Sequence, residues 1–267
     1  MDDGQASLVS LHALSPKLKS LHLSYGYIPP WEVFDLISSS PSLENLSLRS
    51  AGHGEPYLPD IPSASTKLTG FLSLAMDFGI QFCICGLLAF PGGLRFSEIF
   101  VEFYIGDTES INDLVSACCD TLESFGLSYD LPSAFISISA TRWLAKRPLT
   151  ATYSPGASEA PVVVDLSKAT KLKTVKFHSR RSRVWWITDM LQTVKSQNLK
   201  QITIRQGQIP EVGGTVLLEW QELDHLLVQF WMLHSIRPKL VGGVSGLRDF
   251  ASTFLPELTG RGLLDVA

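Results

Sequence analysis

Four cysteines are the first residues in the sequence whose type invites a specific chemistry. Cys83 and Cys85 are separated by one residue, and Cys118 and Cys119 are adjacent. Four thiolates can hold a structural zinc ion, but such sites use cysteine pairs separated by about two to four residues. Cys118 and Cys119 also fall on an apolar helical face. We therefore interpret all four as buried structural cysteines and predict neither a metal site nor a cofactor.

Acid–base or nucleophilic catalysis would require a histidine or carboxylate beside a nucleophile. The six histidines show no spacing typical of a zinc protease. Asp224 and His225 are adjacent in a predicted helix and form one acid–base candidate; the alternative that we favour is a solvated helix surface. The stretch GGVSG at 242–246 does not fit a nucleophile elbow, because position 247 is leucine. We therefore predict no catalytic residues and expect that the protein is not an enzyme.

One basic and aromatic cluster combines Arg180, Arg181 and Arg183 with Trp185 and Trp186. Such a cluster could bind RNA or phosphate through charge and stacking. The alternative is a charged turn leading into a helix whose tryptophans pack in the core, and we favour it because such pairs occur at helix starts. The chain also has 22 basic and 26 acidic residues, whereas nucleic-acid binders usually carry a basic excess. We expect no nucleic acid partner.

Composition and apolar segments limit where the protein acts. Hydrophobic residues make up 45% of the chain and charged residues 18%, which is enough apolar material for a long core. The longest apolar stretch, residues 78–90, is too short for a membrane span, which needs about 20 residues. The acidic N-terminus lacks a secretory signal pattern, and four cysteines do not suggest a disulfide framework. We expect no membrane contact and a cytoplasmic or nuclear protein.

A repeat predicts the elements that would position any site. The pattern apolar-x-x-apolar-x-apolar begins at residues 18, 43, 96, 122, 172 and 199, and a looser copy at Leu68, Leu72 and Leu74 is one residue out of register. With residue 68 included, the intervals are 25, 25, 28, 26, 50 and 27 residues. The interval of 50 suggests that a copy near residue 147 is degenerate or replaced by an insertion. Intervals of roughly 20–29 residues are typical of leucine-rich repeats.

Helical periodicity occupies the stretches between these strands. Apolar residues on one helical face predict helices within 31–37, 107–122, 185–194 and 219–234. Stacked strand–helix units bury a continuous core between a parallel sheet and a layer of helices. We therefore predict an α/β leucine-rich-repeat solenoid, an arc with a parallel strand sheet on its concave side and helices outside. The prediction is a single domain, 1–267, with an exposed irregular insertion at 130–165 and a helical C-terminal cap at 247–267.

Strand side chains alternate, so the residues between the repeated apolar positions would point away from the core. As a set they predict a small-polar docking face with Phe100 exposed in its middle. The acidic residues Glu98 and Glu102 and the basic Lys176 and Arg205 would suit a protein partner of mixed charge. The candidate partner-binding residues are Ser20, His22, Asn45, Ser47, Arg49, Glu98, Phe100, Glu102, Ser124, Ser128, Lys176, His178, Gln201, Thr203 and Arg205, and Ser24, Gly126 and Thr174 complete the outward positions.

Several stretches resemble the leucine-rich-repeat region of the divergent F-box-like proteins of mushroom-forming fungi. They are PSLENLSL, LLAFPGGLRFSEI, CCDTLESFGLSY, VDLSKATKLKTVKF and FLPELTGRGLLDV, spread over most of residues 16–267. The resemblance implies that the repeats capture a substrate and that an N-terminal F-box docks a ubiquitin-ligase adaptor. No F-box-like helical triplet precedes Leu18, so this sequence predicts only the binding half of that role and leaves the adaptor open as a partner.

Together these features predict a non-catalytic protein-interaction module of the substrate-recognition type, with a protein partner of unknown identity. One alternative is a structural protein that dimerises through an exposed solenoid end, which a bare apolar N-terminal strand would favour. Another alternative is an enzyme of unrecognised class, which would need an enclosed pocket lined by perturbed acids, bases or a nucleophile.

Overall fold

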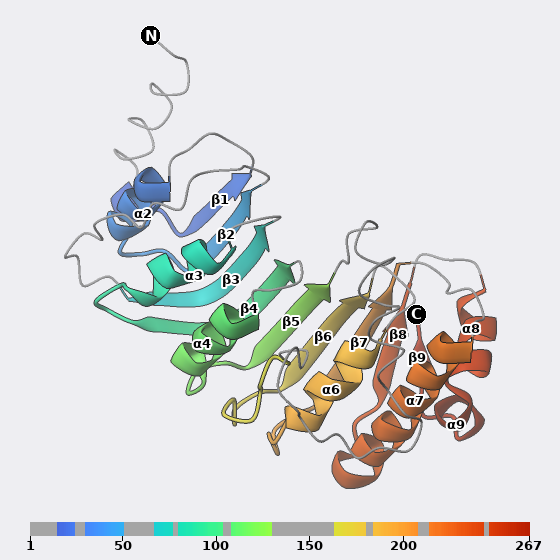
Figure 1. Cartoon of the computed structure of the whole chain (residues 1–267). Helices are drawn as coiled ribbons and strands as arrows, with labels where there is room; N and C mark the ends of the chain where they lie inside the picture. Colours follow the sequence, from blue (N-terminus) through green and yellow to red (C-terminus); the bar gives the residue numbers. More distant parts are fainter. Residues whose placement is uncertain are drawn as a thin grey trace, which may run out of the picture.

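Figure 1 shows the chain as a computed structural model. The structure describes residues 15–24, 30–50, 67–76, 80–103, 108–129, 163–179, 184–207, 214–242 and 246–267. These residues form an α/β fold whose sheet has nine strands, with every neighbouring pair parallel. The predicted α/β class with a parallel sheet is therefore confirmed.

The strands lie side by side in chain order from β1 to β9. Parallel neighbours cannot be joined by a tight hairpin, so the chain must cross back to the starting edge before each new strand. Helices make this crossing after β1, β3, β4, β6, β7 and β8. The strands are β1 (Ser20–Ser24), β2 (Asn45–Ser50), β3 (Leu68–Met76), β4 (Leu94–Phe103), β5 (Ser124–Tyr129), β6 (Thr174–Ser179), β7 (Gln201–Gln206), β8 (Pro238–Val241) and β9 (Asp265–Val266). The helices are η1 (Ser15–Lys17), α2 (Pro30–Ser38), α3 (Ile80–Leu88), α4 (Thr108–Cys118), α6 (Trp185–Thr193), α7 (Gly214–His234), α8 (Leu247–Phe254) and α9 (Pro256–Gly260).

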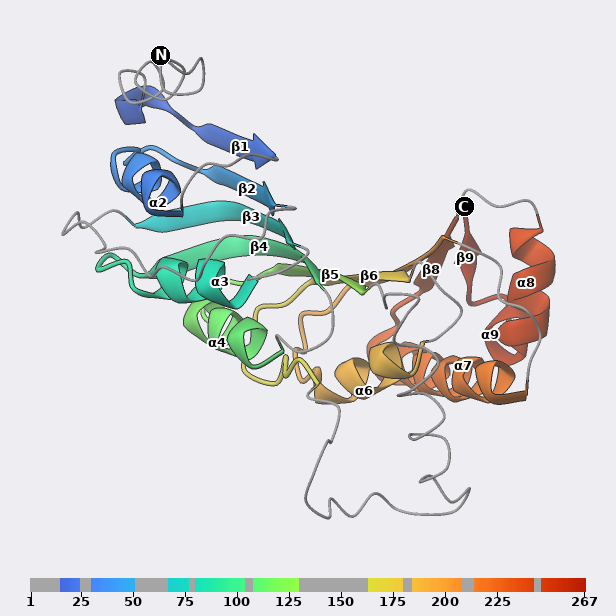
Figure 2. The same cartoon turned by 45° about the horizontal axis from the view of Figure 1, so that its top comes forward.

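The helices are gathered on one side of the sheet. Figure 2 shows α2, α3, α4, α6 and α7 along that side, with α8 and α9 beside β9 at the C-terminal end. Neighbouring helices are in contact: α3 packs against α4, and α6 packs against α7. The opposite face of the sheet carries no helix within the described ranges, and we refer to it as the open face.

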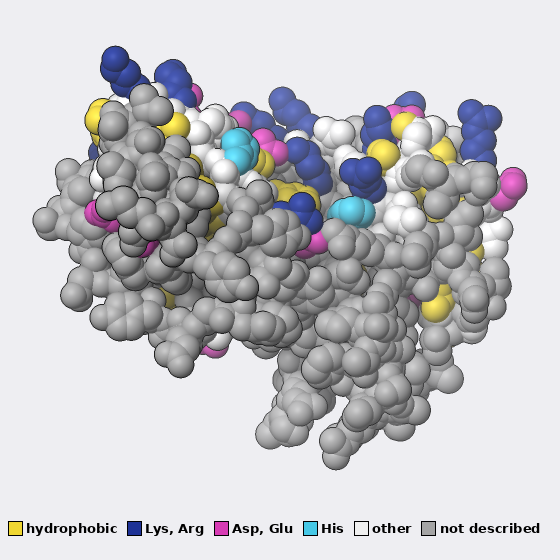
Figure 3. All heavy atoms as spheres, turned by 90° about the horizontal axis from the view of Figure 1, so that it is seen from above, with side chains coloured by type: hydrophobic (Ala, Val, Ile, Leu, Met, Phe, Trp, Pro, Cys, Tyr) yellow, Lys and Arg dark blue, Asp and Glu magenta, His cyan; other side chains and the backbone are white. Residues whose placement is uncertain are grey.

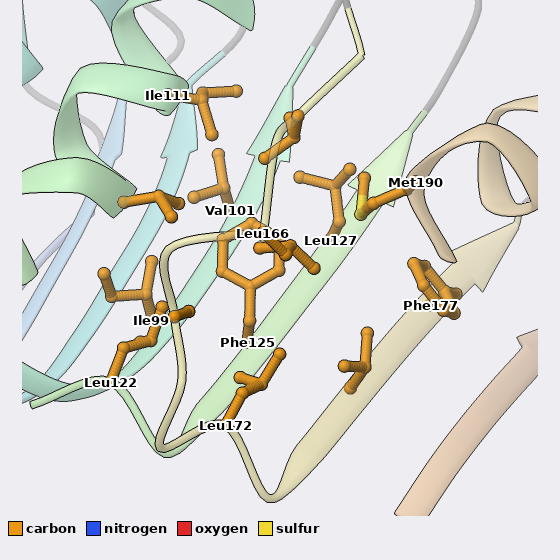
Figure 4. Close-up of a cluster of buried hydrophobic side chains, with 14 of the residues drawn as sticks. Ile99, Val101, Ile111, Leu122, Phe125, Leu127, Leu166, Leu172, Phe177 and Met190 are labelled. Carbon is orange, nitrogen blue, oxygen red and sulfur yellow. The ribbon is translucent and has the colours of Figure 1, made fainter. Parts of the chain in front are cut away.

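The core lies between the sheet and the helices. Figure 4 shows its middle, where Phe125 projects from β5 among Ile99 and Val101 of β4, with Ile111 of α4 and Met190 of α6 at its border. Burial of such a side chain contributes about 1.5–3 kcal/mol, so the repeated apolar positions hold the strands in register. The predicted inward residues that are buried are Leu21, Leu43, Leu46, Leu48, Leu68, Leu72, Leu74, Phe96, Ile99, Val101, Leu122, Phe125, Leu127, Leu172, Val175, Phe177, Leu199, Ile202 and Ile204.

A register shift between β3 and β4 lies beside the repeat copy that is shifted by one residue, because Ser97 of β4 has no partner on β3. Gly70 is opposite Phe96 of β4, whereas the next residue, Phe71, is opposite Glu98. Gly70 has a φ of +83°, and a Cβ added to it would collide with the backbone oxygen of Glu44. Glycine adopts this φ without strain, whereas other residues do not. The irregular spacing in the sequence therefore reflects a defined backbone feature.

The long interval in the repeat contributes no strand between its neighbours, because β5 pairs directly with β6. Most of the predicted insertion, 130–162, lies outside the described residues. At its end Val164 is buried, so the prediction of an exposed insertion up to residue 165 is wrong there. Asn112 of α4 holds this segment against the helices. Its Nδ2 donates to the oxygen of Val163 at 3.2 Å, and its Oδ1 accepts the amide of Asp165 at 2.7 Å.

The C-terminal segment that was predicted as a helical cap contains α8, α9 and a last strand. The ring of Phe250 packs edge-on against Trp220 of α7, with centroids 4.9 Å apart, and stacks on Phe254 at 4.7 Å. These contacts attach α8 to the end of the helical layer. The sequence does not predict β9, because two residues are too few to show an alternating pattern.

Candidate protein-binding face

The outward side chains of the open face fall into three rows, each made of residues opposite one another in neighbouring strands. The first row is Ser20, Asn45, Phe71, Glu98, Ser124, Thr174 and Gln201. The second row is His22, Ser47, Ser73, Phe100, Gly126, Lys176, Thr203 and Lys239. The third row is Arg49, Ala75, Glu102, Ser128, His178, Arg205 and Val241. The strand register therefore brings every predicted binding residue into these rows.

Two strands supply outward residues that the sequence analysis missed. Phe71, Ser73 and Ala75 belong to β3, whose shifted register concealed them. Their alternation with the apolar Leu72 and Leu74 is the signal that could have identified them. Lys239 and Val241 belong to β8, which has four residues and begins with proline. That strand is too short for the repeat pattern to identify.

Exposure to solvent divides the predicted binding residues into three groups. Six are exposed, namely Ser20, His22, Arg49, Lys176, Gln201 and Arg205. Eight are half-buried, namely Asn45, Ser47, Glu98, Phe100, Glu102, Ser124, His178 and Thr203. Ser128 is fully buried. The predictions that Phe100 is exposed and that Ser128 is part of a solvated face are therefore wrong.

Phe100 is half-buried because its ring lies over Gly126 on the neighbouring strand. A Cβ added to Gly126 would be 2.5 Å from Cδ2 of Phe100 and 3.3 Å from Cε2. Real side chains do not approach this closely, so the ring can rest here only because residue 126 has no side chain. The middle of the open face thus carries an aromatic ring pressed onto the backbone of β5.

A polar cluster crosses β5 next to this ring. Lys176 Nζ of β6 forms an ion pair with Glu98 Oε1 of β4 at 2.8 Å. Ser124 of β5 lies between these strands and donates from Oγ to the same carboxylate oxygen at 3.3 Å. The Lys176 and Glu98 side chains are 47% and 39% exposed, and exposed ion pairs contribute only about 0.2–1 kcal/mol. The cluster therefore orients these groups more than it stabilises the fold.

Ser128 places a hydroxyl in the third row between Glu102 and His178. Its Oγ is buried and has no hydrogen-bond partner within the described part of the chain. A buried polar group without a partner costs about 1–3 kcal/mol. At this point, the third row is therefore not optimised for stability.

Charge is distributed unevenly across the open face. Its outward positions include the basic residues Arg49, Lys176, Arg205 and Lys239, three of them on β6, β7 and β8. Two of the acidic residues, Glu98 and Glu102, are both on β4, and Asp265 of β9 is opposite Lys239. Figure 3 shows Lys and Arg side chains along the upper margin of the molecule, on the side of the sheet away from the helices. The face is slightly basic on a chain of net charge −4.

The cysteines differ in their surroundings. Cys83 and Cys118 are buried, and burial raises the pKa of Cys83 to about 12 and that of Cys118 to about 11. Such thiols stay protonated at neutral pH and are inert as nucleophiles. Cys85 is exposed and Cys119 is half-buried, so the prediction of four buried cysteines is wrong for these two. In the described ranges, no three His, Cys, Asp or Glu side chains are grouped to hold a metal ion.

Asp224 is a buried helix cap, and the predicted solvated helix surface is therefore wrong for this residue. Its carboxylate accepts the amides of Glu257 at 2.7 Å and Leu258 at 3.1 Å, at the start of α9. Burial raises its pKa, although these two hydrogen bonds act in the opposite direction. His225 is exposed, and its Nδ1 lies 3.7 Å from the carboxylate Oε1 of Glu257. The pair therefore has the geometry of a structural contact between α7 and α9.

The predicted core position of the tryptophans is confirmed for Trp186, which packs edge-on against Phe177 with centroids 5.6 Å apart. Trp185 is partly buried against the same core. Residues 180–183, which include the three arginines of the basic cluster, lie outside the described residues, as do positions 243–245 of the GGVSG stretch. The open face therefore remains the candidate site.

Comparison with known proteins adds no assignment: no family model matches the chain, and neither does a curated protein or a solved structure. Within the described residues, no helix is long and apolar enough to cross a membrane. Function must therefore be inferred from the geometry of the open face.

Proposed function

We propose that this chain is a leucine-rich-repeat solenoid whose open face is the concave, protein-binding side of an arc. The spacing of equivalent strand positions supports this. Residues of the first row are separated by 25, 26, 27, 26, 50 and 27 positions, measured from Ser20 to Gln201. All but one of these intervals fall in the range of roughly 20–29 residues that such repeats use.

The observation that carries a binding role is the ladder of polar side chains on the open face. Each of the strands β1–β8 presents alternate residues there, while the helices occupy the other side. Phe100 provides an aromatic contact in the middle, and the Lys176–Glu98 pair and exposed Arg205 surround it with charge. Aromatic and arginine side chains are enriched among the residues that dominate protein–protein binding energy.

The resemblance to fungal F-box-like proteins supports a substrate-recognition type of binding, in the cytoplasm or nucleus. We propose a role without catalysis or a cofactor. Recruitment of a ubiquitin-ligase adaptor rests on the resemblance alone, so it is the second part of the proposal and requires its own readout.

Capture of partners from a fungal lysate by immobilised full-length chain tests both parts. The open-face variant combines Phe100→Ala with Arg205→Glu. The control combines Leu218→Ala with Arg248→Glu, which likewise replaces an apolar residue by alanine and an arginine by glutamate, at exposed positions on α7 and α8. We expect a specific protein to be retained by wild type and control and reduced at least about tenfold by the open-face variant.

Equal capture by the open-face variant would show that this face is not the binding site. Ligase adaptor and cullin subunits among the captured proteins would support the receptor role. Their absence, with a different specific protein lost from the open-face variant, would restrict the function to binding alone.

A second candidate function is self-association, and exposed apolar residues on α7 favour it. Met232 and Leu233 near the end of this helix are 65% and 77% exposed. Large apolar side chains exposed side by side can mark an interface. Light scattering after size-exclusion chromatography tests this candidate function. Self-association predicts that wild type is a dimer and that Met232→Glu with Leu233→Glu converts it to a monomer. A monomeric wild type would remove it.

A further inference from the structure

Basic side chains gather around Arg205 on the C-terminal half of the open face. Arg205 lies in the third row on β7, and Lys176 and Lys239 occupy the second row on the strands at either side, β6 and β8. Strands are about 4.8 Å apart and rise about 3.3 Å per residue, so each lysine Cα lies about 8 Å from that of Arg205. Three cations therefore share a small area of the sheet.

Most of this charge is not neutralised locally. Lys176 is paired with Glu98, but Arg205 and Lys239 form no ion pair within the described part of the chain. Asp265 is opposite Lys239 on β9, yet the two side chains do not pair. Like charges about 8 Å apart on neighbouring strands repel each other. An anionic partner would relieve this repulsion.

Hydrogen-bonding groups beside these cations fit a carboxylate. Gln201 donates from Nε2 to Thr203 Oγ1 at 3.2 Å, which leaves the hydroxyl proton of Thr203 directed elsewhere. Thr203 lies between Lys176 and Lys239 in the second row. A carboxylate above Thr203 could therefore accept from its hydroxyl while facing cations on both neighbouring strands.

The number of cations distinguishes a peptide from a nucleic acid. Tight binding of nucleic acid neutralises about six to ten phosphates. Arg205 and Lys239 are two cations without a partner, on a chain of net charge −4. In an extended peptide, side chains two residues apart are about 6.8 Å apart, close to the spacing of the cations. The geometry thus matches a few carboxylates better than a phosphate backbone.

We infer that the surface formed by Lys176, Thr203, Arg205 and Lys239 binds an extended acidic peptide segment of a partner protein, with carboxylates two residues apart. The inference rests on the proposed function, because it names the chemistry of the partner that the open face recognises.

Selection from a random library of displayed peptides of about twelve residues tests this inference without a known partner. The bait is the full chain, in wild-type form or as Arg205→Glu with Lys239→Glu. The control, Lys67→Glu with Arg248→Glu, makes the same change in net charge at exposed positions away from the surface. We expect wild type and control to enrich peptides with Asp or Glu at alternate positions. A synthetic peptide of this kind should bind the Arg205→Glu, Lys239→Glu variant at least about tenfold more weakly than it binds wild type. The same peptide with Gln in place of its acids should also bind wild type at least about tenfold more weakly.

Four outcomes would overturn the inference. Enriched peptides that lack acids would leave the proposed binding function standing while refuting the acidic partner. Acidic peptides that bind all three baits equally would assign them to another surface. Single-stranded oligothymidylate that competes for the same surface more strongly than the acidic peptide would point to nucleic acid. Selection of no peptide by wild type, with a protein still captured through the open face from lysate, would also refute an extended segment.

Discussion

Substitution of Gly126 by alanine should destabilise the protein only while Phe100 is present. The φ of Gly126 lies outside the left-handed region, so alanine fits the backbone there. Such a substitution should by itself stabilise by about 0.4–1 kcal/mol, because it restricts the unfolded chain. The new Cβ would be 2.5 Å from Cδ2 of Phe100, however, so the ring must turn aside.

The displaced ring sets the size of the effect. An off-rotamer side chain costs about 0.5–1.5 kcal/mol, and loss of part of the ring's burial costs about 1 kcal/mol. We expect Gly126→Ala to lower the free energy of unfolding by about 1 kcal/mol in wild type and to raise it by about 0.5 kcal/mol in Phe100→Ala. The sign of the change therefore depends on the ring.

Urea unfolding followed by tryptophan fluorescence measures these differences, since Trp186 and Trp220 are buried. Gly214→Ala at the start of α7 is the control, because its Cβ would meet no atom within 4 Å. It should have the same effect with or without Phe100. If Gly126→Ala stabilises both backgrounds equally, the ring does not lie on β5 and the description of the open face is wrong.

Three further predictions concern the backbone, a buried acid and the cysteines. Gly70→Ala should destabilise the protein by about 3 kcal/mol or more, because residue 70 has a positive φ and the new Cβ would collide with the backbone. Gly93→Ala should cost about 1 kcal/mol, because residue 93 has a φ of +71° but open space around it. Urea unfolding measures both losses. Because the folded pKa of Asp224 is raised, its stabilising protonated form is lost as pH rises above the unfolded value of about 3.8, so the unfolding free energy of wild type should fall relative to Asp224→Asn between acidic and neutral pH. Iodoacetamide at mildly alkaline pH should label exposed Cys85 and leave Cys83 unlabelled, as mass spectrometry of the digested native protein would show.

Each of these predictions has a result that contradicts it. Equal losses for Gly70→Ala and Gly93→Ala would mean that Gly70 does not lie against the backbone of Glu44 as described. A stability difference between wild type and Asp224→Asn that does not change with pH would mean that this carboxyl is not perturbed by burial. Labelling of both cysteines at the same rate in the native protein, with a denatured sample as reference, would place Cys83 at the surface.

Local periodicity was enough to predict the repeating strands and most of the helices. A strand repeats its side-chain direction every two residues, so the buried Phe125 and Leu127 also identify outward residues such as Ser124. The same alternation identified fifteen candidate residues that the register places in shared rows. The apolar helix α3 was not predicted, because its residues 80–88 are apolar on nearly every side and show no amphipathic period.

Tertiary structure decided the features that depend on residues distant in sequence. Ser128 occupies an outward position by alternation, yet it is buried by its surroundings in the folded chain. Asp224 caps a helix that begins more than thirty residues later, and no local pattern records that contact. Gly126 is an ordinary strand glycine until Phe100, 26 residues earlier, is brought beside it by the sheet register. Periodicity depends on local backbone geometry, whereas burial, capping and the shape of the open face depend on which segments the stacking of strands brings into contact.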